Sequence, residues 1–169
     1  MMNSKWPTKW FITGIVFLVI EMGLKVSAWI YQDYLKSADI EIFSVFDYVS
    51  SSLVYVENRH SAFGMLRSVP IWVNQGLLMF SVIVLIVLTY QQATSPDTTA
   101  VTRRGMVCFV IGALGNMMDR CTVGAVVDYI DIRIGTYTLA WNISDLVINL
   151  GFVHIIYDVL QKKREEKTI

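Results

Sequence analysis

The stretch "VVDYIDIRIGTYTLAWNISD", residues 126–145, joins two long apolar segments of the chain, 105–123 and 141–160. Each segment is close to the roughly 20 mostly apolar residues that a helix needs to cross a hydrocarbon core of about 30 Å. Yet the stretch itself holds three acids, Asp128, Asp131 and Asp145, together with Asn142. A membrane protein that places acids between two spans needs a reason to do so.

Two more apolar segments, 10–30 and 71–90, precede this region. Of the 169 residues, 54% are hydrophobic and 17% are charged, and the apolar residues occur in blocks, not at amphipathic spacing. The first block is expected to be a retained anchor, because Glu21 and Lys25 lie inside it and no A-x-A-like site ends it. We therefore predict one integral membrane domain over residues 1–169, of the all-α class, with four transmembrane helices at about 10–30, 71–90, 105–123 and 141–160.

The basic residues orient these spans. They gather near both termini and in the loop after the second span, as Lys5, Lys9, Arg103, Arg104, Lys162, Lys163, Arg164 and Lys167. The segment 31–70, on the opposite side, is mildly acidic. Because basic loops stay inside, both termini are predicted to be cytoplasmic and 31–70 to be an exported loop.

The exported loop has two parts. Its stretch "IFSVFDYVSSSLVYV" (42–56) is rich in Phe, Val and Tyr and lacks Pro and Gly, which favours strands. We expect a small β element there, resting on the outer leaflet. The next stretch, "ENRHSAFGMLRS" (57–68), is predicted to form a short interfacial helix.

Polar side chains within the first and third spans have two explanations. A charged group at membrane depth costs about 2.5 to 3.5 kcal/mol on insertion scales, so such groups are usually paired or functional. On the first span, Glu21 and Lys25 are one helical turn apart, and an intrahelical ion pair near the outer surface accounts for them.

On the third span, Gly112, Asn116 and Arg120 share one helical face, with Asp119 beside them. Helix packing explains this face about as well as a functional site does. Glycine lets neighbouring helices approach closely, and Asn116 would supply a hydrogen bond between helices.

Asp128 and Asp145 are predicted to lie at the exported membrane surface, one just after the third span and one in the first turn of the fourth. When two carboxylates are held close, repulsion and partial burial drive their proton affinities apart. One then acts as a general base on water while the other donates a proton, as in aspartic proteases. The alternative treats Asp145 as a first-turn acid favoured by the helix dipole and Asp128 as a loop acid. It does not explain why Asn116, Arg120 and Asn142 occur at the same depth.

Three motifs carry a resemblance to a known family. "GALGNMMDR", "VVDYID" and "WNISD" follow one another as G-x-x-x-N-x-x-D-R, V-V-D-F and F-N-x-A-D do in the lipoprotein signal peptidases (signal peptidase II). "ENRHSAFG" resembles the R-N-x-G-A-A-F segment of that family. The likeness in length and in number of spans extends over essentially the whole chain.

The resemblance implies an aspartyl endopeptidase of the bacterial inner membrane, with its active site at the periplasmic face. It would remove signal peptides from diacylglyceryl-modified prolipoproteins by cutting just before the lipidated cysteine. Asp128 and Asp145 match the catalytic pair. Residues at supporting positions are Asn58, Asn116, Asp119, Arg120, Asn142, Glu21 and Lys25. Residues 42–56 would form a β-cradle that helps to hold the substrate, and membrane lipids and globomycin-type inhibitors would be further partners.

Some positions depart from the family pattern. Glu21 stands where the family has the Asp of a D-x-x-x-K pattern, and a longer acid is expected to preserve the pair with Lys25. His60 replaces a Gly, a residue that permits positive φ and close backbone approach, so it is expected to relocate the loop or to enter the substrate groove. Trp141 and Ser144 replace Phe and Ala, which are milder changes.

Other functions are less well supported. Cys108 and Cys121 lie about 20 Å apart on one predicted helix, at ~1.5 Å per residue, so they cannot pair as in a disulfide oxidoreductase. No cofactor, metal or nucleic-acid partner is expected, and the protein is expected to be a monomer. Two rivals remain: a divergent paralogue that binds prolipoprotein or a peptidase inhibitor without turnover, and a small membrane scaffold or ion-translocating protein. An ion-translocating protein that relays protons would need acids spread across the membrane depth, whereas the predicted acids gather at one surface.

Overall fold

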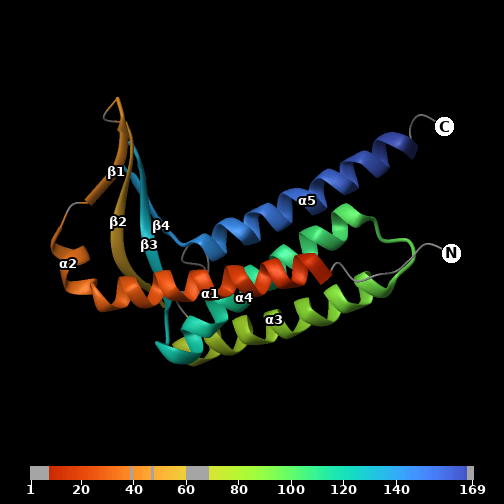
Figure 1. Ribbon diagram of the computed structural model, residues 1–169, viewed down its shortest axis with the longest axis horizontal. Helices are drawn as coiled ribbons and strands as arrows, with labels where there is room; N and C mark the ends of the chain where they lie inside the picture. The colour runs from red at the N-terminus through yellow and green to blue at the C-terminus, as the bar shows by residue number, and fades with distance from the viewer. Residues whose placement is uncertain (1–7, 39, 47, 60–68, 167–169) are drawn as a thin grey trace.

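Four long helices run side by side along the long axis of the computed structural model, and a sheet stands across one end of them (Figure 1). The structure describes residues 8–38, 40–46, 48–59 and 69–166. The long helices are α1 (Thr8–Ile30), α3 (Ile71–Thr94), α4 (Ala100–Thr122) and α5 (Ile143–Glu166). They overlap the four predicted spans and extend beyond them by up to six residues at an end.

Three of these helices, α1, α3 and α5, are long and apolar enough to cross a membrane, among the residues that the structure describes. α4 is as long as α1, at 23 residues. It is less apolar because it carries charged residues near both ends, Arg103, Arg104, Asp119 and Arg120. The start of α1 and the end of α5 lie at the end of the bundle away from the sheet (Figure 1). All four helices therefore run between the same two ends.

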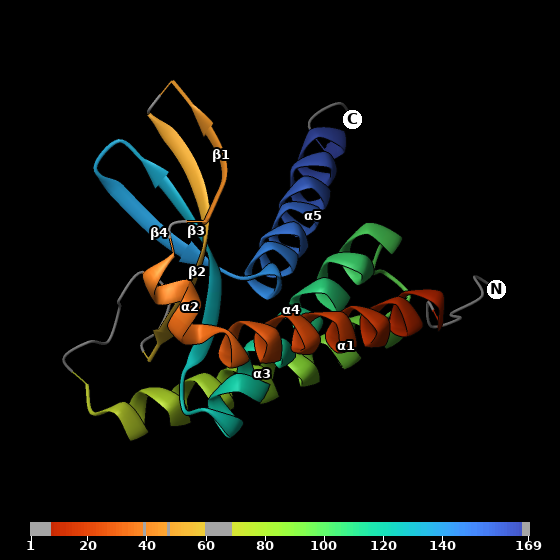
Figure 2. The same ribbon diagram turned by 60° about the vertical axis from the view of Figure 1, so that its left-hand side comes forward.

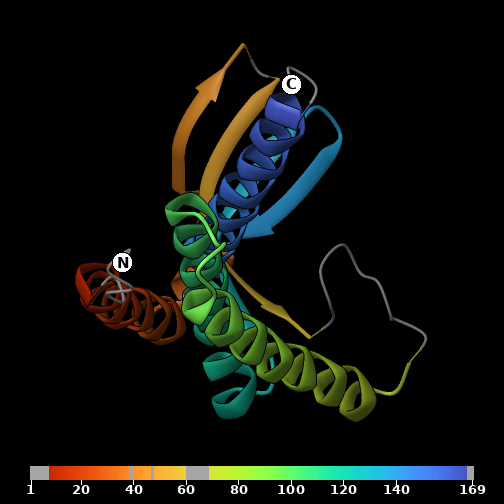
Figure 3. The same cartoon turned by 90° about the vertical axis from the view of Figure 1, so that its right-hand side faces the viewer.

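α4 is the central helix of the bundle. Figure 3, which looks nearly along the helices, shows it between α1, α3 and α5, and it contacts all three. Glycines bring α4 and α5 close together: a Cβ on Gly112 would lie 2.5 Å from the Ser144 carbonyl oxygen, and one on Gly151 would lie 2.6 Å from the Gly105 carbonyl oxygen. Helix packing therefore explains Gly112, which was one of the two explanations proposed for this face. The same packing turns the polar end of α4 inward.

The sheet is larger than the sequence predicted. It has four antiparallel strands in the order β1 (Ile40–Val45), β2 (Val49–Asn58), β3 (Val126–Ile134) and β4 (Tyr137–Trp141). β1 and β2 fall in the predicted strand region 42–56. β3 and β4 come from the stretch before α5, so the all-α class left out half of the sheet. Asp128 accordingly lies in a central strand and not in a loop.

A tight turn explains the unpredicted hairpin. Gly135, at φ 57°, occupies the left-handed region between β3 and β4, which glycine adopts without steric cost. Its N–H donates to the Tyr48 carbonyl oxygen at 2.8 Å, so the turns of the two hairpins lie together. β3 then runs past the sheet-side end of α1 (Figure 2) and contacts both α1 and α4.

The described part of the loop between α1 and α3 differs from its prediction in two further ways. A short helix, α2 (Gln32–Ser37), directly follows α1, and the sequence analysis did not predict it. The sequence predicted an interfacial helix at 57–68. Residues 57 and 58 instead form the end of β2. Residues 60–68, including His60, lie outside the described residues.

Candidate active site

One asparagine connects the two predicted acids at the sheet end of the bundle. Asp128 lies in β3, and Asp145 lies in the first turn of α5. The Asn142 side-chain nitrogen donates to Asp128 Oδ1 at 2.7 Å, and its side-chain oxygen accepts from the Asp145 backbone N–H at 3.0 Å. Asn142 is 1% exposed, so water does not compete for these bonds. The structure thus brings Asp128, Asn142 and Asp145 into one cluster.

Asn142 and Asp145 also form the N-terminal cap of α5. In addition to the bond from the Asp145 N–H to the Asn142 side chain, the Asn142 backbone N–H donates to Asp145 Oδ2 at 3.4 Å. This reciprocal pairing three residues apart is the capping-box arrangement, which satisfies two otherwise unpaired donors at a helix start. The cap fixes the Asp145 carboxylate relative to Asn142, and through Asn142 relative to Asp128.

Two further asparagines hold the remaining oxygens of the two acids. The Asn58 side chain, at the end of β2, donates to Asp128 Oδ2 at 3.2 Å. The Asn116 side chain, on α4, donates to Asp145 Oδ1 at 2.8 Å. All four carboxylate oxygens therefore accept a hydrogen bond. Asn58, Asn116 and Asn142, all proposed as supporting residues from the sequence, contact the acids directly.

Lys25 and Asp119 lie behind this cluster and tie α1, α4 and β3 together. Lys25 Nζ lies 2.7 Å from Asp119 Oδ2 and 3.4 Å from Glu21 Oε1, and it donates to Asn116 Oδ1 at 3.1 Å. Asp119 Oδ2 also accepts from the Val127 backbone N–H at 2.9 Å. Because Val127 precedes Asp128 in β3, this bond anchors the strand beside the acid.

The intrahelical Glu21–Lys25 ion pair that the spacing suggested is present, but it is buried and is one part of a larger network. Glu21 is 0% exposed and Lys25 is 2% exposed, and the shorter contact of Lys25 is to Asp119 on another helix. The physical reason is that α4 covers this face of α1, so a charge placed there needs partners from several elements.

Tyr129 is the residue of this site that sequence reasoning missed. Its hydroxyl donates to Glu21 Oε2 at 2.6 Å and accepts from the Ile143 backbone N–H at 3.2 Å. Glu21 Oε1 accepts from the Ser144 backbone N–H at 3.2 Å. The first N–H groups of α5 are thus paired with side chains from α1 and β3. The sequence signal was present: Tyr129 stands where the resembled motif has Phe, and its hydroxyl meets the longer acid at position 21.

The other departures have simpler outcomes. Trp141 ends β4 and lines the cavity described below. Ser144 is 0% exposed, and its hydroxyl has no hydrogen-bond partner within the described part of the chain.

Arg120, one of the predicted supporting residues, donates to the Asn116 carbonyl oxygen at 3.2 Å and also lines the cavity, close to Asp145.

The environment of Asp128 favours its protonated form. Burial, and next the negative charge of Asp145, raise the pKa of Asp128 from 3.8 to about 7, against hydrogen bonds from Asn58 and Asn142 that lower it. Asp128 is 1% exposed. Burial and the hydrogen bond to Glu21 also raise the pKa of the Tyr129 hydroxyl, which therefore stays a donor.

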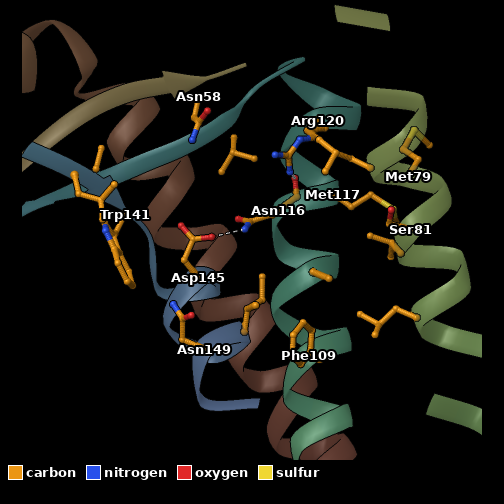
Figure 4. A pocket seen from close by; sticks show the side chains of 18 residues that line it. Asn58, Met79, Ser81, Phe109, Asn116, Met117, Arg120, Trp141, Asp145 and Asn149 are labelled. Atoms are coloured by element: carbon orange, nitrogen blue, oxygen red, sulfur yellow. Dashed lines mark hydrogen bonds between the residues drawn. The ribbon is translucent and has the colours of Figure 1, made fainter. Parts of the chain in front are cut away.

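A cavity of about 470 Å³ opens beside the cluster, between α3, α4, α5 and the sheet. Figure 4 shows Asn58, Asn116, Arg120 and Asp145 at its sheet-side end, and Phe109 and Asn149 farther down the helices. Most of its wall is apolar, with Leu78, Val82, Leu85, Phe109, Ala113 and Ile148 among the lining residues. The cavity can therefore hold an apolar chain whose polar end lies beside Asp145.

The site contains neither a metal cluster nor a disulfide among the residues described. No group of three or more His, Cys, Asp or Glu side chains there is placed to hold a metal ion. Cys108 and Cys121 are both free thiols. The described cluster itself offers carboxylates, amides, a lysine, an arginine and the Tyr129 hydroxyl.

Comparison with known proteins gives the family. The profile of the family described as Signal peptidase (SPase) II matches residues 12–161. The lipoprotein signal peptidase of Vibrio vulnificus is 31% identical over 160 residues, which cover 94% of this chain and 92% of that protein. The lipoprotein signal peptidase of Anaplasma phagocytophilum is 31% identical over 156 residues, with 91% and 96% covered.

Two solved structures share the fold. Both are titled as bacterial membrane enzyme structures obtained by the in meso method, one at 2.3 Å and one at 1.9 Å resolution. The first superposes with a TM-score of 0.74 at 18% identity and covers 96% of this chain and 94% of its own. The second gives a TM-score of 0.69 at 21% identity, with 95% and 97% covered.

Proposed function

Because this chain belongs to the signal peptidase II family, we propose that it is an aspartyl endopeptidase that cuts diacylglyceryl-modified prolipoproteins just before the lipidated cysteine. Family membership makes it a peptidase of lipoprotein signal peptides. The aspartyl mechanism, the cut site and the roles of single residues are the parts that we propose.

The observation that carries the proposal is an acid pair of which one member, Asp145, lines an apolar cavity. Asp128 and Asp145 share Asn142, and Asp145 lines a cavity whose wall is mostly apolar. A signal peptide is an apolar segment that leaves the membrane at its cut site. The cavity would receive that segment, and the acids would meet the peptide bond at its outer end.

Their surroundings support different roles for the two acids. Asp145 lies in the first turn of α5, where the helix dipole favours negative charge. Asp128 lies in a strand, and its raised pKa of about 7 favours the protonated form near neutral pH. We assign Asp145 as the general base and Asp128 as the acid, the division of labour expected when two close carboxylates share one proton.

The reaction then needs only these two acids and a water. Asp145 takes a proton from the water, whose oxygen attacks the scissile carbonyl carbon, while Asp128 gives its proton to the carbonyl oxygen. The tetrahedral intermediate collapses as its carbon–nitrogen bond breaks. Asp145 passes the proton that it accepted to the leaving nitrogen of the lipidated cysteine, and Asp128 recovers its proton from the intermediate's hydroxyl as the new carboxyl group forms.

Asn58 would control access to the acid. Asp128 is 1% exposed, whereas Asp145 lines the cavity, so a substrate carbonyl reaches Asp128 only if the covering groups shift. Asn58, which donates to Asp128 Oδ2, would turn to the bound peptide when the substrate enters. Arg120, on the cavity wall beside Asp145, would hold a substrate carbonyl.

The proposed setting is the bacterial inner membrane. α4 would be a fourth span beside α1, α3 and α5, because α4 lies between these three apolar helices. The basic residues would keep both termini in the cytoplasm, and the sheet with the acids would then lie at the periplasmic face. The protein would act as a monomer within this membrane.

A proton relay is less well supported by the distribution of acids. Asp119 and Asp145 lie at the sheet end of their helices, and Glu21 lies in the half of α1 that is nearer the sheet. Asp158, near the other end of α5, accepts bonds from Thr99 at 2.7 Å and Thr102 at 2.9 Å. These partners make Asp158 a contact between α4 and α5. Acids at the two ends, with none on α5 between 145 and 158, do not form a chain across the membrane.

Purified protein and a diacylglyceryl-modified prolipoprotein test the proposal. The expected product begins with the lipidated cysteine, as mass spectrometry would show, and a substrate that lacks the lipid should remain uncut. A protein that binds the substrate without producing this fragment would be the non-catalytic paralogue instead.

A further inference from the structure

Asn149 is a polar side chain in the apolar part of the cavity. It lies on α5 four residues after Asp145, which is one turn and about 6 Å along the helix. Its side chain is exposed to the cavity that it lines. In Figure 4 its amide points along α5 toward Asp145.

The surroundings of Asn149 give its amide nothing to bind. Phe109 and Ala113 of α4 and Val82 and Leu85 of α3 line the same cavity. The hydroxyl of Ser81, also on this wall, donates to the carbonyl oxygen of Leu77 in its own helix at 2.8 Å. Within the described residues no side chain or backbone group pairs with the Asn149 amide.

The two amides nearest the acids on α4 and at the start of α5 have partners within the protein. Asn116 accepts from Lys25 and donates to Asp145, and Asn142 pairs with Asp128 and with the start of α5. An amide placed in a span without a partner is costly, because the hydrocarbon offers no hydrogen bonds. Asn149 faces an open cavity, so a molecule bound there can supply the partner.

The proposed substrate carries the matching groups at this depth. A signal peptide that crosses the membrane as a helix has no intrahelical partner for its last four carbonyl oxygens. Those carbonyls lie just before the cut site, where the peptide must extend to present one bond to the acids. They therefore enter the cavity about one turn below Asp128 and Asp145, at the level of Asn149.

We propose that Asn149 is a substrate-binding residue whose side-chain nitrogen donates to a carbonyl oxygen of the signal peptide just before the cut. The inference rests on the proposed function, because it takes the occupant of the cavity to be a prolipoprotein. The ester carbonyls of the diacylglyceryl group are a second source of the same acceptor. Substrates with and without these esters separate the two sources.

The test measures binding, so that it does not depend on turnover. A fluorescent lipidated peptide that spans the cut site is titrated onto D128N and onto D128N/N149L, both in detergent. Leucine has the same number and branching of side-chain heavy atoms as asparagine but no hydrogen-bonding group. Losing one hydrogen bond in a water-poor site should weaken binding about tenfold, which corresponds to about 1.4 kcal/mol.

A second peptide identifies the acceptor. It carries the two chains through ether bonds, so it lacks the ester carbonyls. The same tenfold loss with both peptides is the expected result. A loss seen only with the ester peptide would overturn the assignment to a peptide carbonyl, and equal binding by D128N and D128N/N149L would overturn the inference altogether.

Two more variants control for folding and for helix composition. N149Q keeps the amide and should recover part of the binding even if N149L folds poorly. V153L enlarges an exposed apolar side chain one turn farther along α5, outside the cavity lining, and should bind as before. If wild-type protein fails to cut the ester peptide while the N149L effect persists, the proposed function fails and the binding site stands.

Discussion

At the scale of single residues, the site depends on buried polar side chains that pair with one another across several elements. The Asn142 side chain reaches Asp128 and the start of α5, and Lys25 reaches Asp119, Glu21 and Asn116. Removing one partner from such a network leaves a buried group unpaired, which costs more than the bond itself contributes. Asp128 is different, because its charge is destabilised by burial and by Asp145.

This difference predicts how D128N changes stability with pH. The pKa of Asp128 is about 7 in the folded protein against an ordinary 3.8. Between these values the unfolded chain binds fewer protons than the folded one, so this group makes wild-type stability fall as pH rises from about 4 through about 7. D128N lacks that ionisation.

The melting temperature of D128N minus that of wild type, measured in one detergent, should therefore increase between pH 5 and pH 8. At about 1.4 kcal/mol per pKa unit, the change in stability is on the order of a few kcal/mol. A difference that stays constant over this range would contradict the raised pKa of Asp128.

At the scale of elements, the start of α5 is the part that the whole site depends on. Asn142, Tyr129 and Glu21 supply partners to its first N–H groups, and the acid Asp145 lies in the same turn. A helix start that is tied to β3 and α1 in this way cannot rotate without moving the carboxylate.

Y129F should therefore slow cleavage through the acid pair. It removes the donor to Glu21 and leaves the Ile143 N–H without its acceptor, an unpaired buried group that costs roughly 1–3 kcal/mol. We expect kcat to fall about tenfold with little change in KM, because Tyr129 does not line the cavity that would hold the substrate.

A matched control is Y55F, which removes the hydroxyl of another buried tyrosine of the sheet, one that donates to Glu57 at 3.2 Å. It should leave kcat near the wild-type value. The resembled motifs carry Asp and Phe at positions 21 and 129, so E21D/Y129F should lose less than the two single changes together. An unchanged kcat in Y129F would show that the bond does not position Asp145.

The sequence predicted the helices of this site better than its strands. Apolar blocks are long enough to locate α1, α3, α4 and α5, because the membrane demands that length. The β3–β4 hairpin was missed, although Ile130, Ile132 and Ile134 alternate with polar residues and Gly135 marks the turn. The alternation covers only the second part of β3, because residues 126–129 are all buried and show no period of two.

The candidate residues were found from motifs, but their partners were not. Spacing indicated that Asn116 and Arg120 share a face of α4, and it related Glu21 to Lys25 on one helix. It contains no information on which helix covers that face, so the contact of Lys25 with Asp119 and that of Tyr129 with Glu21 required the tertiary structure.

At the scale of the whole molecule, the sheet lies at one end of the helices, and the start of α1 and the end of α5 lie at the other (Figure 1). Asp128 and Asp145 lie at the sheet end, and the basic residues 162–164 lie at the other end. If the membrane surrounds the helices, the two ends face different compartments.

Reporter fusions test this orientation. A reporter enzyme that works only in the cytoplasm should be active when it is attached after Ile169, because the basic residues stay inside. A reporter enzyme that works only outside the cytoplasm should be active when it is inserted in the turn at Gly135 and Thr136, between β3 and β4. The reverse pattern would place the acids on the side where a prolipoprotein signal peptide has no cut site.

The central claim is that Asp128 and Asp145 together cut a lipidated prolipoprotein, and the rates of three asparagine variants test it most directly. D131N is the matched control, because Asp131 is a buried acid of the same strand β3, at 6% exposure, outside the acid pair. With the diacylglyceryl-modified substrate and folded protein in each case, D128N and D145N should each lose nearly all cleavage, while D131N should retain a rate near that of wild type. Cleavage near the wild-type rate in either D128N or D145N would contradict the account.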